Sequence, residues 1–248
     1  MTERTDPPGS RRERPAKPAL TRGGIVAVAV GIMRAEGLQK VTMRRLAQEL
    51  DTGPASLYVY VRNTAELHAA ILDELLATVE RPPAGGDWRD RLERLLTSYT
   101  LMLFEHPGLA QSALVARPSG AHYLNLVEAV LALLDEGGVP SGQAAWGLDL
   151  LLQYATATAA EHAGRDGTPR TRGEWDALAA ALRGASGRTH PHTASLADEL
   201  LSGEPAARLS WGFRMLLNGI LQTPVHASDH ASDHTPVRTP GPGTPEHP

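Results

Sequence analysis

Apolar side chains recur at intervals of three and four residues through almost the whole chain. Ile25, Ala29 and Ile32 form one such series, and Leu67 and Ile71 begin another. This spacing places apolar side chains on one face of an α-helix, whereas no segment shows the alternation typical of a β-strand. Aromatic residues, which favour strands, make up only 4% of the 248 residues. The pattern therefore predicts an all-α fold.

Capping residues, glycines and prolines divide the chain into segments. Residues 1–19 and 224–248 are polar and proline-rich, and we expect both to be disordered tails. Residues 164–195 are rich in Gly, Arg and Thr and are expected to be mobile around one short helix at 174–182. The remaining helices are expected at 21–36, 42–50, 54–61, 63–79, 87–105, 119–136, 141–163 and 205–222.

Composition excludes several classes of protein. There is no cysteine, which excludes disulfides, thiolate catalysis and Cys-ligated metal sites. No apolar run approaches the roughly 20 residues that a membrane span requires. The N-terminal segment also lacks the apolar stretch of a signal peptide. We therefore expect a cytoplasmic protein without membrane contact.

The segment from Thr42 to Val61 predicts a helix-turn-helix. Two short helices are separated by a four-residue break, Asp51-Thr52-Gly53-Pro54. In such a motif the second helix exposes one face to the major groove of DNA. Apolar residues of the pair are expected to pack against Ile25, Ile32 and Leu67; they are Leu46, Ala47, Leu50, Leu57 and Val61. The side chains left outward on the second helix are Ala55, Ser56, Tyr58, Val59 and Tyr60.

This segment resembles the helix-turn-helix of the TetR (tetracycline repressor) family of bacterial transcriptional regulators. The likeness runs without gaps from about Leu20 to Val79 and includes Thr-x-Arg-x-Leu-Ala and Ser-Leu-Tyr-x-x-Val. It implies an N-terminal three-helix domain at 20–66 and a larger helical effector-binding and dimerisation domain at 67–223, beginning with a connecting helix at 67–80. The DNA-contacting positions that it implies are Thr42, Arg44, Gly53, Pro54, Ala55, Ser56, Tyr58, Val59, Tyr60 and Thr64.

Two positions depart from the family's pattern. Thr64 stands where the family usually has a phosphate-binding lysine, so one phosphate contact is expected to be missing. Asp51 stands where the family usually has glycine, and aspartate tolerates the left-handed conformation that the turn requires.

The resemblance also reaches the second half of the chain. It implies a homodimer through the helices at 144–163 and 205–222, with Leu148, Leu151, Leu152, Ala155, Ala159 and Ala160 on the dimer surface. An effector cavity is expected among the other helices, without a cofactor or a bound metal. Its predicted lining is Tyr99, Met102, Leu103, His106, Leu114, His122, Leu126, Gln153, Tyr154, Glu161 and Trp175.

The resemblance bears on the effector as well. Glu161 matches a position that holds tetracycline with its magnesium in the tetracycline repressor. Other polar positions of that site fall on Ala113, Ala116 and Ala129 in this chain. A different effector, small and apolar or amphipathic, is therefore expected.

Charge is unevenly distributed along the chain. Residues 1–66 carry a net charge of +4, and half of that excess lies in the first 19 residues. Arg11, Arg12 and Arg14 in this arm could enter a minor groove. The sequence thus predicts a bacterial, nucleoid-associated regulator, most simply a repressor, that binds a partly palindromic double-stranded DNA operator.

Two alternatives remain open at this stage. His226, His230 and His234 lie four residues apart with Asp229 and Asp233 between them, which would suit a metal-responsive regulator. A helical enzyme is the other alternative, although no catalytic motif such as His-Glu-x-x-His occurs in the sequence. We therefore expect no catalytic residues.

Overall fold

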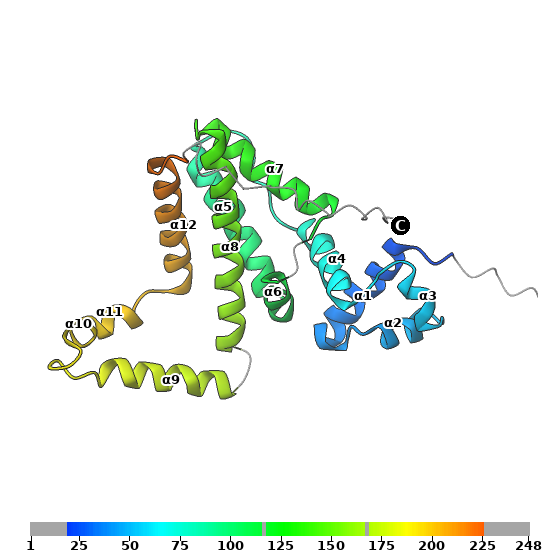
Figure 1. Ribbon diagram of the computed structural model, residues 1–248, viewed down its shortest axis with the longest axis horizontal. Helices are drawn as coiled ribbons and strands as arrows, with labels where there is room; N and C mark the ends of the chain where they lie inside the picture. Colours follow the sequence, from blue (N-terminus) through cyan, green and yellow to red (C-terminus); the bar gives the residue numbers. More distant parts are fainter. Residues whose placement is uncertain (1–18, 116–117, 167–168, 226–248) are drawn as a thin grey trace, which may run out of the picture.

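The computed structural model describes residues 19–115, 118–166 and 169–225, with only the backbone described for 163–166 and 169–172. These residues form α-helices, one short 3-10 helix and no strand (Figure 1), as the helical spacing predicts. The elements are α1 (Arg22–Glu36), η1 (Leu38–Lys40), α2 (Met43–Glu49), α3 (Pro54–Tyr58), α4 (Thr64–Leu76), α5 (Trp88–Phe104), α6 (Pro107–Ala113), α7 (Ala121–Glu136), α8 (Ser141–Asp166), α9 (Pro169–Arg183), α10 (Pro191–Ser195), α11 (Ala197–Leu201) and α12 (Pro205–Gln222). None of these helices is long and apolar enough to cross a membrane.

The N-terminal helices α1, α2 and α3 form a small head whose core also includes the start of α4. Ile25, Leu46, Leu57, Val61 and Leu67 are completely buried there. These are the residues that apolar spacing assigns to the core of the helix-turn-helix, so that prediction is confirmed. From this head, α4 leads into the rest of the molecule (Figure 1).

The body of the molecule is built around α8, which packs against α5, α6, α7 and α12. Leu95 and Leu103 from α5, Val130 from α7, and Leu151 and Ala155 from α8 lie in its core with at most 1% of their surface exposed. These apolar residues form the contacts between the helices of the body.

Three helices form an arm at the end of α8. Figure 1 shows α9 turning sharply away from α8, with α10 and α11 at its far end, before α12 returns alongside α8. Within the described part of the chain, α9 packs mainly on α8, α10 and α11. The arm therefore extends from the body instead of lying within it.

Several helix boundaries differ from the sequence-based expectation. No helix was expected between 105 and 119, but Pro107 begins α6, because the first helical position tolerates proline. α8 ends at Asp166 instead of residue 163, and α9 is longer than the short helix expected at 174–182. α3 ends at Tyr58, three residues earlier than residue 61. α10 and α11 were not expected.

Candidate DNA-binding surface and effector cavities

The turn between α2 and α3 has the geometry of a helix-turn-helix. Asp51 adopts a φ of 47°, the left-handed conformation that its aspartate side chain was expected to tolerate. The backbone N–H of Thr52 donates to the carbonyl of Ala47 at 2.8 Å, which closes the turn. Gly53 is the N-cap of α3, and Pro54 occupies its first helical turn. Local chain chemistry therefore fixes the angle between the two helices.

Two neighbouring arginines in the first turn of α2, Arg44 and Arg45, have different surroundings. Thr42 caps the helix by accepting a hydrogen bond from the backbone N–H of Arg45 at 3.1 Å. The Arg45 guanidinium donates to the carboxylates of Glu49 at 2.6 Å and Glu36 at 2.9 Å, and these hydrogen bonds, the one to Glu49 first, raise the pKa of Arg45. Arg44 is exposed and forms no such pair with any residue that the structure describes. Arg45 therefore ties α2 to α1, while Arg44 remains available for a ligand outside the chain.

A surface at the tip of the head combines residues from α2 and α3. We call it the recognition surface, and its exposed members are Thr42, Arg44, Gly53, Pro54, Ala55, Ser56, Tyr58 and Val59. Val59 is 80% exposed and Tyr58 is 51% exposed, although both are large apolar residues. Tyr60 differs from the others, since it is half-buried and packs against the core. The surface thus presents methyl, hydroxyl, phenol and guanidinium groups together.

The connecting helix α4 is firmly capped at the head. The Asn63 side chain accepts from the backbone N–H of Glu66 at 2.8 Å, and the Glu66 carboxylate accepts from the backbone N–H of Arg62 at 2.9 Å. That backbone hydrogen bond, helped by the Arg62 side chain, lowers the pKa of Glu66. Thr64, the first residue of α4, is exposed beside this cap. The cap orients α4 relative to the recognition surface.

A narrow cavity lies where the helices from α4 to α8 meet. This central crevice measures about 90 Å³ and is lined by Leu72, Tyr99, Ala113, Leu114, Pro118, Tyr123, Asp149, Leu152, Gln153 and Thr156. At its wall, the Tyr99 hydroxyl and the Thr156 hydroxyl are hydrogen-bonded at 2.8 Å. Burial raises the pKa of Tyr99 to about 12, so the phenol stays protonated at neutral pH. In this crevice the connecting helix α4 shares a cavity with α5, α7 and α8.

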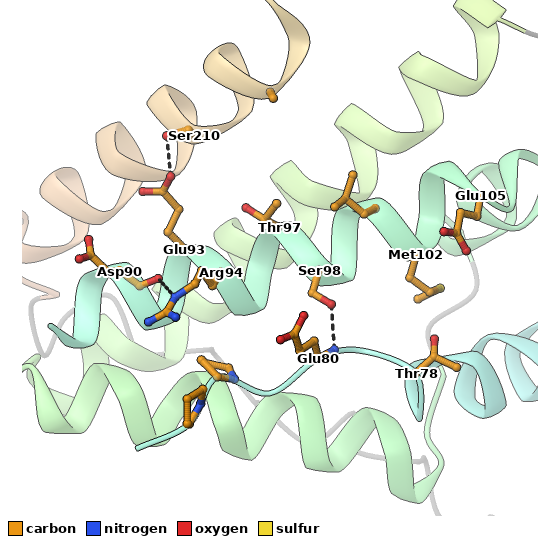
Figure 2. Close-up of a pocket in the computed structure, with 14 residues that line it drawn as sticks. Thr78, Glu80, Asp90, Glu93, Arg94, Thr97, Ser98, Met102, Glu105 and Ser210 are labelled. Carbon is orange, nitrogen blue, oxygen red and sulfur yellow. Dashed lines mark hydrogen bonds between the residues drawn. The ribbon is translucent and has the colours of Figure 1, made fainter. Parts of the chain in front are cut away.

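Other cavities lie outside the crevice, and predicted effector residues line two of them. One, the arm cavity, measures about 370 Å³ and lies between α5, α8, the arm and α12. The other is an open groove of about 1000 Å³ between the 77–87 linker, α5 and α12. Figure 2 shows that Glu80, Asp90, Glu93 and Glu105 line this outer groove, with Arg94 as the labelled cation. The groove therefore contributes to the negative charge of the body.

Sequence comparison now decides the family. A family model described as "Tetracyclin repressor-like, C-terminal domain" matches residues 81–223. The HTH-type transcriptional repressor DrrR1 of Streptomyces coeruleorubidus is 31% identical over 223 residues, covering 86% of this chain and 81% of DrrR1. The chain belongs to the TetR family of transcriptional regulators. It is accordingly a ligand-responsive transcriptional repressor, as the resemblance of its helix-turn-helix predicts.

Solved structures of similar proteins agree with this assignment. The transcription regulator SCO7704 of Streptomyces coelicolor is 59% identical, with a TM-score of 0.75 and coverage of 85% of this chain and 98% of that one. ActR of Streptomyces coelicolor is 36% identical, with a TM-score of 0.73 and coverage of 82% and 97%. ActR has also been solved in complex with actinorhodin.

The TetR-like body does not bring the predicted effector residues into one cavity. Tyr99, Leu114 and Gln153 line the central crevice, whereas Tyr154, Glu161 and Trp175 line the arm cavity and Met102 borders the outer groove. The structure divides the predicted single lining between cavities, because adjacent residues of α8 such as Gln153 and Tyr154 point to different neighbours.

The remaining predicted lining residues lie in none of these three cavities. Leu103 and Leu126 are core residues with 0% and 4% exposure. His106 is the half-buried N-cap of α6, where burial lowers the pKa of its imidazole. His122 is half-buried in the first turn of α7. Of the alanines that replace polar tetracycline-site positions, Ala113 lines the crevice, Ala129 packs against the core, and Ala116 lies outside the described residues.

The residues predicted for the dimer surface are mostly on the wrong face of α8. Leu151, Leu152, Ala155 and Ala159 are at most 7% exposed because they pack inside the chain, and Leu148 and Ala160 are half-buried. The outer face instead carries Trp146 and Leu150 on α8, with Trp211 and Met215 on α12, all between 47% and 62% exposed. Periodicity identified both helices, but it could not distinguish their two apolar faces.

Other predicted sites cannot be placed in this structure. The basic arm with Arg11, Arg12 and Arg14 and the histidine repeat from His226 to His234 lie outside the described residues. Among the residues that are described, no group of three or more His, Asp and Glu side chains could hold a metal ion.

Proposed function

We propose that this TetR-family repressor binds a partly palindromic operator on nucleoid DNA as a homodimer and is released by an apolar or amphipathic aromatic effector. The observation that carries the proposal is the recognition surface, in which Arg44, Tyr58 and Val59 are exposed on a well-packed head. The chain acts by binding, and no catalytic step is assigned to it.

The recognition surface suits the major groove of DNA. The Arg44 guanidinium can donate hydrogen bonds to the edge of a guanine. Val59 and Ala55 can pack against thymine methyl groups. The exposed hydroxyls of Thr42, Ser56 and Tyr58 suit phosphate oxygens. Half-buried Tyr60 is the lesser contributor, since part of its ring is committed to the core.

Dimerisation is assigned to the outer face of α8 and α12. Trp146, Leu150, Trp211 and Met215 are large apolar residues exposed on neighbouring helices that pack together. Two copies of this face related by a two-fold axis would form a four-helix contact, and tryptophan is typical of the centre of such interfaces. The two-fold axis would set two recognition surfaces against two half-sites.

The effector is assigned to the central crevice because α4 contributes to its wall. At about 90 Å³ the crevice is smaller than the roughly 300–1,000 Å³ of typical ligand sites. An effector must therefore widen it, pushing Leu72 on α4 away from Tyr99 and Thr156 on α5 and α8. Movement of α4 would turn the recognition surfaces away from the two half-sites. To reverse operator occupancy from about 99:1 to about 1:99, the effector must bind the released state more favourably than the DNA-bound state by about 5.5 kcal/mol.

The complex of ActR with actinorhodin supports an aromatic effector for this chain. The crevice combines the Tyr99 and Tyr123 rings with Leu72 and Leu114, and it offers Gln153 and Thr156 as polar groups. Alanine at 113 removes one polar group of the tetracycline site. We therefore expect actinorhodin to raise the melting temperature more than tetracycline with magnesium does.

The DNA-binding proposal is tested by footprinting on the promoter of the protein's own gene. Replacing Arg44 and Tyr58 by alanine is expected to abolish protection at concentrations that saturate the parent. A bidentate arginine contact alone is worth about 1–3 kcal/mol. Arg89→Ala is the matched control, since Arg89 lies over the Trp88 ring on α5 and not on the head. Equal protection by the double variant and the parent would contradict the proposal.

A further inference from the structure

A smaller cavity adjoins the outer groove near the start of α5. This side pocket measures about 160 Å³ and lies between α5, α8 and α12. Its inner lining consists of five apolar side chains that are at most 5% exposed, those of Leu92, Leu96, Leu151, Phe213 and Leu217. Its mouth is polar and consists of exposed or half-buried residues: Asp87, Arg89, Asp90, Glu93, Arg214 and Asn218. The side pocket therefore leads from a charged surface to apolar side chains of the core.

The side pocket has room for one aromatic ring. An apolar cavity of about 150 Å³ lined by leucine, isoleucine and phenylalanine is large enough to hold benzene. The side pocket has a similar volume, about 160 Å³, and its inner lining of four leucines and one phenylalanine is of the same kind. Its size and chemistry thus suit a single phenyl ring.

Two carboxylates stand where the side pocket meets the outer groove. Asp90 and Glu93 border both cavities. Figure 2 shows both on the same stretch of α5, with the Glu93 carboxylate accepting a hydrogen bond from the Ser210 hydroxyl on α12 at 2.5 Å. Neither carboxylate forms an ion pair with a residue that the structure describes. Both can therefore accept charge-assisted hydrogen bonds from a cationic ligand.

The charge around the two cavities favours a cation over an anion. Three guanidinium groups border them, against five carboxylates, which are those of Glu80, Asp87, Asp90, Glu93 and Glu105. Two of the arginines have partners in the chain. Arg89 lies over the Trp88 ring, 4.5 Å from its centroid, and Arg94 donates to the backbone carbonyl of Asp90 at 3.3 Å. An ammonium group at the mouth of the side pocket would therefore lie in a field that attracts it.

The side pocket is separate from the surfaces described above. None of the residues that line it borders the central crevice or the arm cavity. None belongs to the recognition surface or to the four residues assigned to the dimer face. The operator, the effector and the second subunit therefore leave this pocket without an assigned occupant.

We propose that the side pocket binds a phenylalkylamine, a molecule in which a short carbon chain joins one aromatic ring to a primary ammonium group. The ring packs on the inner lining beside Phe213, and the ammonium group donates to the carboxylates of Asp90 and Glu93. Each half alone is a weak ligand. A ring without the charge loses the charge-assisted hydrogen bonds, and an amine without the ring buries no apolar surface.

The proposal is tested first by calorimetric titration of the full chain with three probes. 2-Phenylethylamine carries the ring and the charge, 2-phenylethanol keeps only the ring, and ethylamine keeps only the charge. We expect one 2-phenylethylamine to bind per chain, at least about tenfold more tightly than either other probe. If one of the simpler probes binds as tightly as 2-phenylethylamine, or if 2-phenylethylamine does not saturate the chain, the proposal is wrong.

Charge variants test the mouth of the pocket. Asp90→Asn combined with Glu93→Gln should weaken 2-phenylethylamine at least about tenfold and leave 2-phenylethanol unchanged. Glu128→Gln combined with Asp135→Asn is the matched control, because it removes the same two charges from exposed positions on α7 outside both cavities. Equal affinities of the two double variants for 2-phenylethylamine would overturn the proposal.

A bulky variant tests the inner lining. Leu217→Phe fills part of the side pocket and should weaken 2-phenylethylamine and 2-phenylethanol alike, whereas Leu216→Phe, outside the pocket on α12, should not. Gln153→Leu alters the central crevice and should leave the titration unchanged, so a loss in that variant would place the amine in the crevice and refute the proposal. Circular dichroism checks the fold of each variant, and the three probes decide the matter even if Leu217→Phe does not fold.

Discussion

The carboxylate of Asp73 on α4 accepts a hydrogen bond from the backbone N–H of Tyr123 in the first turn of α7, at 2.9 Å. The N-cap of α7 is Gly120, which has no side chain to cap the helix. Gly120 lies so close to the Asp73 carboxylate that a Cβ atom there would clash with it. A residue of the connecting helix therefore caps a helix of the effector domain, with favourable charge at its N-terminus.

This contact predicts a coupling role for Asp73. Asp73→Ala is expected to cost about 1 kcal/mol of folding free energy, the usual value of a cap. Operator affinity without effector should change little, because the recognition surface is remote from Asp73. The effector concentration for half-release should rise severalfold, because movement of α7 no longer reaches α4 directly. Gel shifts with an effector titration measure both quantities.

Asp73→Asn is the control, since asparagine caps as well as aspartate. It should retain most of the coupling. Gly120→Ala should reproduce the alanine defect by forcing the two groups apart, and the double variant should be no worse than either single variant. Unchanged effector release in both single variants would show that coupling runs by another route.

Replacing Thr64 by lysine should strengthen operator binding. Thr64 is exposed at the start of α4, beside the capped end of the head, and lysine there would reach a phosphate. One added phosphate contact steepens the dependence of log affinity on log salt by about 0.9. Fluorescence anisotropy over a salt series measures the slope. Thr223→Lys adds the same charge at the exposed end of α12, and an equal slope in both variants would refute a local contact.

Trp211→Glu should dissociate the proposed dimer. Trp211 is 62% exposed on α12, and burial of a tryptophan at an interface centre is worth about 2 kcal/mol or more. Sedimentation velocity over a dilution series should show a dissociation constant raised at least roughly 30-fold. Leu124→Glu, on α7 at 60% exposure, is the matched control. A dimer unaffected by Trp211→Glu would exclude this face.

The buried ring of His68 leads us to expect that the folded state loses stability in mild acid. Its Nδ1 lies 3.1 Å from the Ser112 hydroxyl on α6, and its Nε2 is buried without a partner among the described residues. Burial lowers the pKa of His68 below its ordinary 6.5, so the folded state favours the neutral ring. The stability is therefore fully present above pH 6.5 and declines as the pH falls toward the lowered pKa.

Melting temperatures measured from about pH 7 to about pH 5 check this prediction. His68→Gln should flatten the decline but not abolish it, because burial also lowers the pKa of His106. His192→Gln is the control, since His192 is exposed in α10. If the melting temperature of His68→Gln falls with pH as steeply as that of the parent, the prediction is wrong.

The sequence by itself determined the head and most of the helix boundaries. Thr42 and Asn63, the first residues of two expected helices, cap those helices, Asp51 adopts the left-handed conformation, and Leu46 and Leu57 are buried. These features depend on neighbours within a few positions, where capping and helical spacing act directly. The recognition surface could therefore be predicted from Thr42 to Val59 before any packing was known.

Only the tertiary structure decided where the cavities of the body lie and which helix faces stay exposed to solvent. Leu150 and Leu151 are adjacent leucines on α8, yet the first is 48% exposed and the second is fully buried. Asp73 and Gly120 are 47 positions apart, and nothing local indicates that they touch. Periodicity reports how apolar a face is, whereas cavities and interfaces depend on which helix packs against it, a long-range property of the folded chain.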